Sequence, residues 1–166
     1  MKILIISGLI VFLFNSCSAN YEKAFISKYN LEEFSQFNGV DMSFRGADKQ
    51  KNLVIYGYAP DLINNTSKVG YYLIRLKEQN YQVVEMKWTL IENNVKADTI
   101  KLQHLAQTFI MYRIPRLNVD TAGNVFVYLK DVEKLALVRF ANENELQKRS
   151  REVKWINIKH NWYKPR

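Results

Sequence analysis

An α+β fold is the class that the sequence predicts: an antiparallel β-sheet of about six or seven strands, packed by one long helix, with short helices near the N-terminus. Three observations carry this prediction. Apolar and polar residues alternate with a period of two within residues 39–90, apolar residues recur at helical spacing within 98–113, and polar turn residues join the segments. The connections between the predicted strands are short, and short connections join antiparallel neighbours, so the sequence favours an antiparallel meander.

The alternating region predicts four strands. Val40, Met42 and Phe44 alternate with polar residues, and residues 84–90 repeat the pattern. The segments 53–59 and 69–77 are rich in β-branched and aromatic residues, as strands are. The joints at 46–52, 61–68 and 79–80 carry turn chemistry.

The segment from Asp98 to Arg113 returns to helical spacing. Asp98 is suited to cap the start of the helix, and Pro115 ends it. The apolar residues fall on one face, which we expect to cover the meander: Leu102, Leu105, Ala106, Phe109 and Ile110. The opposite side is expected to present Lys101, His104, Gln107 and Thr108 to water.

Shorter elements flank these segments. Residues 21–37 have helix-like spacing interrupted near Asn30, which predicts one or two short helices. Residues 118–129 are typical of a hairpin with its turn at 120–124, and 135–140 of a further strand. The string 119–127 resembles the Asp-x-x-Gly-Asn-Val hairpin of β-propeller repeats, but one copy cannot build a propeller, so it predicts a turn only. Residues 142–151 are expected to form a loop or surface helix.

The first residues have the layout of a secretory signal. Lys2 supplies a positive charge, and residues 3–14 form an apolar run of about a dozen residues. That run is shorter than the roughly 20 residues of a membrane-spanning helix. We therefore expect a signal peptide at 1–16, a tether at 17–22 and one globular domain at 23–166.

Phe14, Asn15, Ser16 and Cys17 resemble the lipobox of bacterial lipoproteins, of the looser Bacteroidetes type. The resemblance implies that Cys17 is lipidated and anchors the chain to a membrane. It also implies a periplasm-facing protein, because no acidic run follows the cysteine. Two alternatives remain: an ordinary cleaved signal with an incidental thiol, or a cytosolic chain with an apolar first helix. Cys17 is the only cysteine, so no intramolecular disulfide can form.

Positive charge concentrates at the C-terminus. The whole chain has 24 basic and 16 acidic residues. Residues 147–166 alone contain seven of the basic residues and one acidic residue, Glu152. This excess favours anionic lipid, an anionic wall polymer or an acidic protein as a partner. Nucleic acid is not expected, because an exported protein seldom meets it.

Two surfaces are candidate binding sites. The first is the basic aromatic tail, where cations lie beside aromatic rings: Trp155, Lys159, Trp162, Tyr163 and Lys164. The alternative is that Trp155, Ile156, Ile158 and Trp162 dock on the core. The second is the solvated side of the tyrosine-rich strands, with Tyr56 and Tyr58 on one side and Tyr71 and Tyr72 on opposite sides. Core packing is the alternative for these tyrosines.

The sequence contains no recognisable catalytic or metal motif. His104 and His160 stand far apart without neighbouring ligands, and no glycine-rich phosphate loop is present. We therefore expect no metal, no cofactor and a noncatalytic binding or scaffolding role in the cell envelope. An envelope hydrolase built from scattered carboxylates and an immunity-type protein that neutralises a toxin are the alternatives.

Overall fold

The computed structural model describes residues 20–59, 71–89 and 98–166. The chain divides into two compact units, one ending at Glu32 and the other spanning Glu33–Arg166. In the first unit, residues 20–29 are helical, and the rings of Phe25 and Tyr29 lie 4.8 Å apart. No helix in the described ranges is long and apolar enough to cross a bilayer. The predicted signal peptide, Cys17 and the turn at 61–68 lie outside these ranges.

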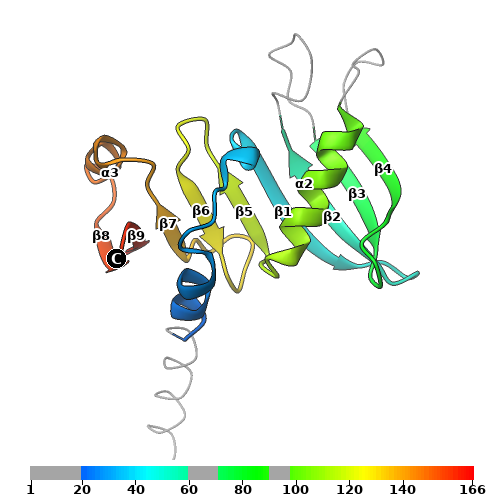
Figure 1. The fold of residues 1–166 in the computed structure, drawn as a ribbon, viewed down its shortest axis with the longest axis horizontal. Coiled ribbons are helices and arrows are strands. Elements are labelled where there is room, and N and C mark those ends of the chain that lie inside the picture. The colour runs from blue at the N-terminus through cyan, green and yellow to red at the C-terminus, as the bar shows by residue number, and fades with distance from the viewer. Residues whose placement is uncertain (1–19, 60–70, 90–97) are drawn as a thin grey trace, which may run out of the picture. The chain divides into compact units, whose positions relative to one another are not determined.

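The second unit is built on one antiparallel sheet (Figure 1). Its strands are β1 (Val40–Ala47), β2 (Asn52–Tyr58), β3 (Tyr71–Lys77), β4 (Val83–Thr89), β5 (Arg116–Val119), β6 (Val125–Tyr128), β7 (Leu137–Arg139), β8 (Trp155–Lys159) and β9 (Trp162–Pro165). The helices are η1 (Ser35–Phe37), α2 (Thr99–Met111) and α3 (Glu143–Arg149). The strand order is β4-β3-β2-β1-β5-β6-β7-β9-β8.

The α+β class and the antiparallel meander of β1 to β4 are confirmed. The predicted strand number is wrong, because the described residues already form nine strands in one sheet. The last two strands, β8 and β9, lie in the segment whose sequence predicts a basic aromatic tail. Its sequence mixes exposed apolar and charged residues, so period-two alternation did not reveal a strand there.

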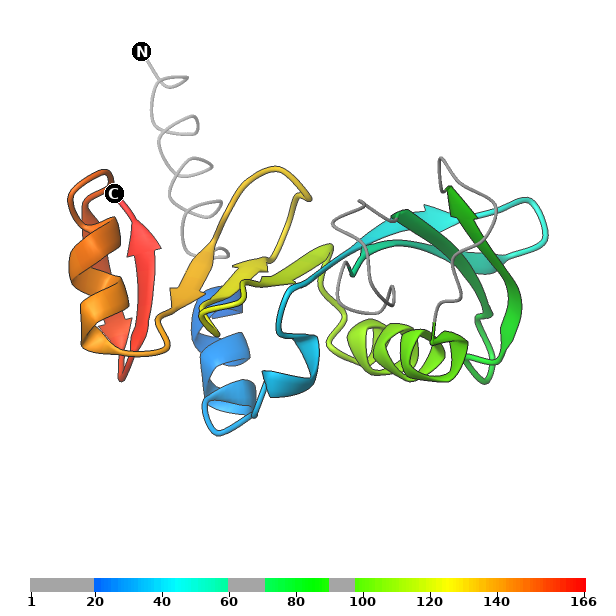
Figure 2. The ribbon, with the colours of Figure 1, turned by 90° about the horizontal axis from the view of Figure 1, so that it is seen from above.

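Helix α2 packs as its spacing predicts. The Asp98 carboxylate accepts the backbone N–H of Lys101 at 2.9 Å and so caps the first turn. All five predicted apolar residues of α2 are buried. Figure 2 shows α2 lying along one face of the strands β1 to β4. Met42, Ile55 and Ile74 of these strands are fully buried.

One long helix does not pack the whole sheet, which corrects the second detail of the predicted fold. Arg149 at the end of α3 lies over the ring of Phe126 in β6, 4.9 Å from its centroid. Phe126 pairs with Asn118, which pairs with Asp41, and cross-strand partners share a face. Asp41 alternates with Val40 and therefore points away from α2. Helix α3 thus covers the opposite face, at the other half of the sheet.

Candidate functional site

The C-terminal basic tail is a β-hairpin at the edge of the sheet, and we call β8 and β9 the terminal hairpin. Strand β9 pairs with β7 through Val138 and Tyr163 and through Arg139 and Trp162. Among the described strands, β8 pairs with β9 alone, so it lies at the edge of the sheet.

Trp162 belongs to the core, so its place in the predicted binding surface is wrong. The side chain is 0% exposed. Its ring meets Phe34 edge-on at 6.5 Å, and the guanidinium of Arg139 lies 5.4 Å from its centroid and 4.9 Å from that of Phe34. Tyr112 extends the cluster, because its ring lies 5.4 Å from Phe34. Because Trp162 pairs directly with Arg139 across the strands, both side chains lie on the face of the sheet that packs against Phe34.

Trp155 and Tyr163 point to the other face of the terminal hairpin, toward α3. Their rings lie 5.2 Å and 5.4 Å from that of Phe140, and both side chains are half-buried. Phe140, Leu146 and Tyr163 line one small pocket there. The alternative prediction, that the apolar residues of this segment dock on the core, therefore holds for Trp155 and Trp162. It does not hold for Ile156, which is 41% exposed.

The cations of this segment remain at the surface. Lys164 is half-buried, but Arg151, Lys154, Lys159 and Arg166 are exposed. We call these four residues the exposed cations. Within the described ranges, none of their side chains forms an ion pair. Val153 and Ile156 lie between them in sequence and are 38% and 41% exposed. The terminal segment therefore presents uncompensated positive charge beside apolar side chains.

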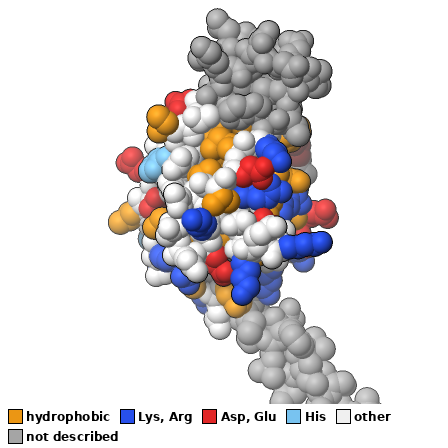
Figure 3. All heavy atoms as spheres, turned by 90° about the vertical axis from the view of Figure 1, so that its right-hand side faces the viewer, with side chains coloured by type: hydrophobic (Ala, Val, Ile, Leu, Met, Phe, Trp, Pro, Cys, Tyr) orange, Lys and Arg blue, Asp and Glu red, His pale blue; other side chains and the backbone are white. Residues whose placement is uncertain are grey.

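The β4 end of the sheet has a different charge pattern. Arg75 forms ion pairs with Glu85 and with Asp48, the latter at 3.4 Å, and Lys87 approaches Glu85 at 2.6 Å. Seen from this end, basic and acidic side chains are interspersed (Figure 3). Mixed charge of this kind is compensated locally, so this end does not share the field of the terminal segment.

The tyrosine-rich strands divide between surface and core. Tyr56 and Tyr71 are 46% and 57% exposed, whereas Tyr72 is 1% exposed. The prediction that Tyr71 and Tyr72 point to opposite sides is therefore confirmed. Arg45 lies 5.2 Å from the ring centroid of Tyr56, and the rings of Tyr58 and Tyr71 lie 5.6 Å apart.

The sequence did not predict a polar network that lies on β1 and β5, on the same face of the sheet as Tyr58. Arg116 donates to Asp41 from Nε at 2.9 Å and from Nη2, and Asn118 donates to Asp41 at 3.0 Å. The hydrogen bonds to Asp41 raise the pKa of Arg116 above its usual value. Burial raises the pKa of Tyr128, which stacks on Arg116 at 4.8 Å. Both groups therefore stay protonated at neutral pH, so neither is suited to act as a base.

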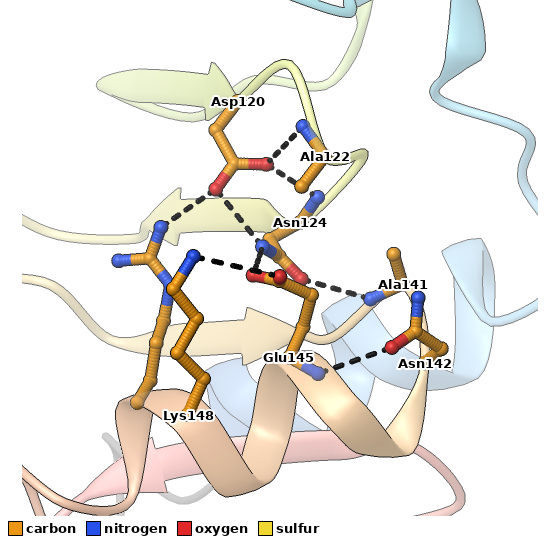
Figure 4. A network of polar contacts seen from close by, with 8 residues as sticks. Asp120, Ala122, Asn124, Ala141, Asn142, Glu145 and Lys148 are labelled. Atoms are coloured by element: carbon orange, nitrogen blue, oxygen red, sulfur yellow. Dashed lines mark hydrogen bonds and ion pairs between the residues drawn. The ribbon is translucent and has the colours of Figure 1, made fainter.

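A second network joins the β5–β6 turn to α3 (Figure 4). Asn124 is 0% exposed, and its side-chain nitrogen donates to Asp120 and to Glu145, each at 2.9 Å. Its side-chain oxygen accepts the N–H of Ala141 at 3.0 Å. Arg149 donates to Asp120 at 2.7 Å. The turn prediction is confirmed, and the asparagine of the turn also fastens a helix 21 residues away in sequence.

The histidines do not meet. His104 is exposed on α2, as predicted, and His160 is exposed in the turn of the terminal hairpin with a φ of 53°. In the part of the chain that the structure describes, no group of three or more His, Cys, Asp or Glu side chains could hold a metal ion. Comparison with protein-family models, with curated proteins and with solved structures found no match to this chain.

Proposed function

We propose that this protein is a noncatalytic binding protein of the bacterial envelope, anchored to a membrane through lipidated Cys17. Its terminal segment would make a second contact, with anionic lipid head groups. The observation that carries this proposal is the set of exposed cations, which lack ion pairs among the described residues and flank the exposed Val153 and Ile156. Charge beside apolar side chains is what an anionic lipid interface binds, and each cation near such a surface contributes about 1 kcal/mol.

The carboxylates of Asp41 and Asp120 support a binding role over a hydrolytic one. Asp41 accepts hydrogen bonds from Arg116 and Asn118, and Asp120 accepts them from Asn124 and Arg149. These contacts hold strands and a helix together, so the oxygens already serve the fold. A general acid or base needs an oxygen within reach of a substrate proton.

Replacing Cys17 with serine tests the anchor. Serine cannot carry the thioether-linked lipid, so the variant is expected to move from the membrane fraction to the soluble fraction after cell fractionation. The wild-type chain, extracted in parallel, is expected to carry the acyl mass on residue 17 by mass spectrometry. Retention of the variant in membranes, or an unmodified Cys17 in the wild type, would remove the anchor from the proposal.

Removing three of the exposed cations tests the second contact. In the soluble Cys17→Ser background, Lys154→Gln, Lys159→Gln and Arg166→Gln together are expected to weaken binding to anionic phospholipid vesicles at low salt. With about 1 kcal/mol per charge, the triple variant is expected to bind on the order of 100-fold more weakly. The difference is expected to shrink at 1 M salt, where the screening length is about 3 Å. Co-sedimentation over a lipid titration gives both affinities.

The matched control removes the same charge elsewhere. Lys49, Lys77 and Lys101 are also exposed, and Gln at all three lowers the net charge equally. This control is expected to keep most of the vesicle affinity. Equal losses in both triple variants would mean that net charge alone governs binding. An unchanged affinity in the terminal variant would exclude a lipid contact there.

A further inference from the structure

A cleft of about 480 Å³ opens where the C-terminal end of α2 meets the sheet. Apolar side chains from four parts of the chain line it: Phe44 of β1, Leu53 of β2, Ile110 of α2 and Leu129 after β6. Its volume lies within the range of about 300 to 1,000 Å³ that is typical of small-molecule sites. Phe44, Leu53 and Leu129 are only half-buried, so the cleft leaves apolar surface accessible to a ligand.

Two residues that line this cleft have an unfavourable backbone conformation. Tyr81 and Arg113 have φ values of 54° and 56°, in the left-handed region that favours glycine. Turns explain the conformation itself, because the N–H of Arg113 bonds to Ile110 at 3.2 Å and that of Tyr81 to Lys77 at 2.9 Å. Glycine would meet both turns at lower cost. The turns therefore account for the backbone conformation but not for the choice of tyrosine and arginine, which both line the cleft.

The turn that carries Tyr81 is also fixed against α2. Gln107 donates its side-chain N–H to the carbonyl of Tyr81 at 3.0 Å. This bond keeps the β3–β4 turn beside the helix end, so the cleft wall is built into the fold.

Opposite charges lie at the same cleft without pairing. Glu78 and Arg113 both line it and both are exposed. Neither side chain forms an ion pair with any described residue. A ligand that satisfies such a site carries a negative and a positive group joined by an apolar body.

We propose that this cleft binds a short apolar peptide with free ends. Arg113 pairs with the terminal carboxylate, Glu78 pairs with the terminal ammonium group, and the apolar side chains of the peptide are buried against Phe44, Leu53, Ile110 and Leu129. This inference goes beyond the membrane contact and does not depend on the lipid anchor.

The dipeptide Leu-Phe is the probe, titrated into the full chain by calorimetry. The free dipeptide is expected to bind, and acetylation of its amino end or amidation of its carboxyl end is expected to weaken binding about two- to five-fold each, as for exposed ion pairs. Glu78→Gln is expected to abolish the effect of acetylation and to leave that of amidation. Arg113→Gln is expected to do the reverse, which assigns each ligand end to one residue.

Glycine substitutions separate the site from the fold. Arg113→Gly is expected to weaken dipeptide binding while raising the melting temperature by roughly 2 to 5 °C, because it relieves the left-handed conformation. Lys51→Gly is the matched control, since Lys51 has a φ of 62° and does not line the cleft. It is expected to raise the melting temperature similarly without changing dipeptide binding.

Three results would overturn the proposal. The first is the absence of any heat of binding with the dipeptide at about 10 mM, a concentration well above the Kd of about 1 mM that we expect for so small a ligand. The second is equal affinity for the free and the doubly blocked dipeptide, which would make the cleft merely apolar. The third is an acetylation effect that persists in Glu78→Gln.

Discussion

Replacing Trp162 with alanine is expected to lower the free energy of unfolding by about 3 to 5 kcal/mol, as for other buried large aromatics. The side chain is 0% exposed and contacts the ring of Phe34, while Arg139 stacks on both rings. Removing the indole leaves a cavity and takes away one of the two rings that Arg139 covers. Denaturant unfolding followed by circular dichroism gives the free-energy difference.

Two further variants show whether the stability lost in Trp162→Ala comes from the buried ring. Trp162→Phe keeps an aromatic ring against Phe34, so it is expected to recover a large part of the stability. Ile156→Ala lies in the same hairpin but at a side chain that is 41% exposed, so its expected cost is about 1 kcal/mol or less. A loss below about 1 kcal/mol for Trp162→Ala would contradict the assignment of this residue to the core.

Replacing Asn124 with aspartate is expected to cost about 3 to 5 kcal/mol at pH 7, the range for an uncompensated buried charge. The amide nitrogen now donates to Asp120 and Glu145, both at 2.9 Å. A carboxylate of the same shape replaces these two hydrogen bonds with two repulsions. Arg149, which bonds to Asp120, and the exposed Lys148, 3.9 Å from Glu145, are the two cations that offset the three negative charges. The backbone N–H of Ala141 keeps its acceptor.

The pH dependence of this loss distinguishes charge from shape. Crowding three carboxylates raises the folded-state pKa of the group in the variant, so its folded state binds a proton that the unfolded state releases. Such a group costs stability above its unfolded pKa, and the cost is recovered as the pH falls toward about 4, the usual pKa of aspartate. Unfolding at pH 7 and pH 4.5 measures the recovery. Asn161→Asp in the exposed turn of the terminal hairpin is the control. An equal loss at both pH values for Asn124→Asp would contradict the electrostatic cause.

Local patterns predicted the elements whose partners are close in sequence. The meander followed from alternation because one face of β1 to β4 is covered by α2 and the other is wet. Asp98 capped α2 as expected, and the turn at 120–124 formed where its residue types predicted it.

Features that depend on distant partners could not be predicted. The burial of Trp162 depends on Phe34, more than a hundred residues earlier, and on its register with Arg139. Strand β8 has side chains that are partly exposed on both faces, so it lacks the alternation that reveals a strand. Nothing near Asn124 in the sequence indicates that its amide bonds to Glu145, because α3 reaches the turn only through the fold.

The strand order also sets how the chain can assemble. Every neighbouring pair of described strands is consecutive in the chain, except β7 with β9, which are separated by α3 and β8, and β1 with β5. At that seam Asp41 meets Arg116 across a sequence separation of 75 residues. Closing so long a loop costs conformational entropy before the contacts that offset it are made, which is the relation that slows folding in proteins of high contact order. We therefore expect the two locally paired halves of the sheet to join late in folding, along the line that the Asp41–Arg116 pair marks.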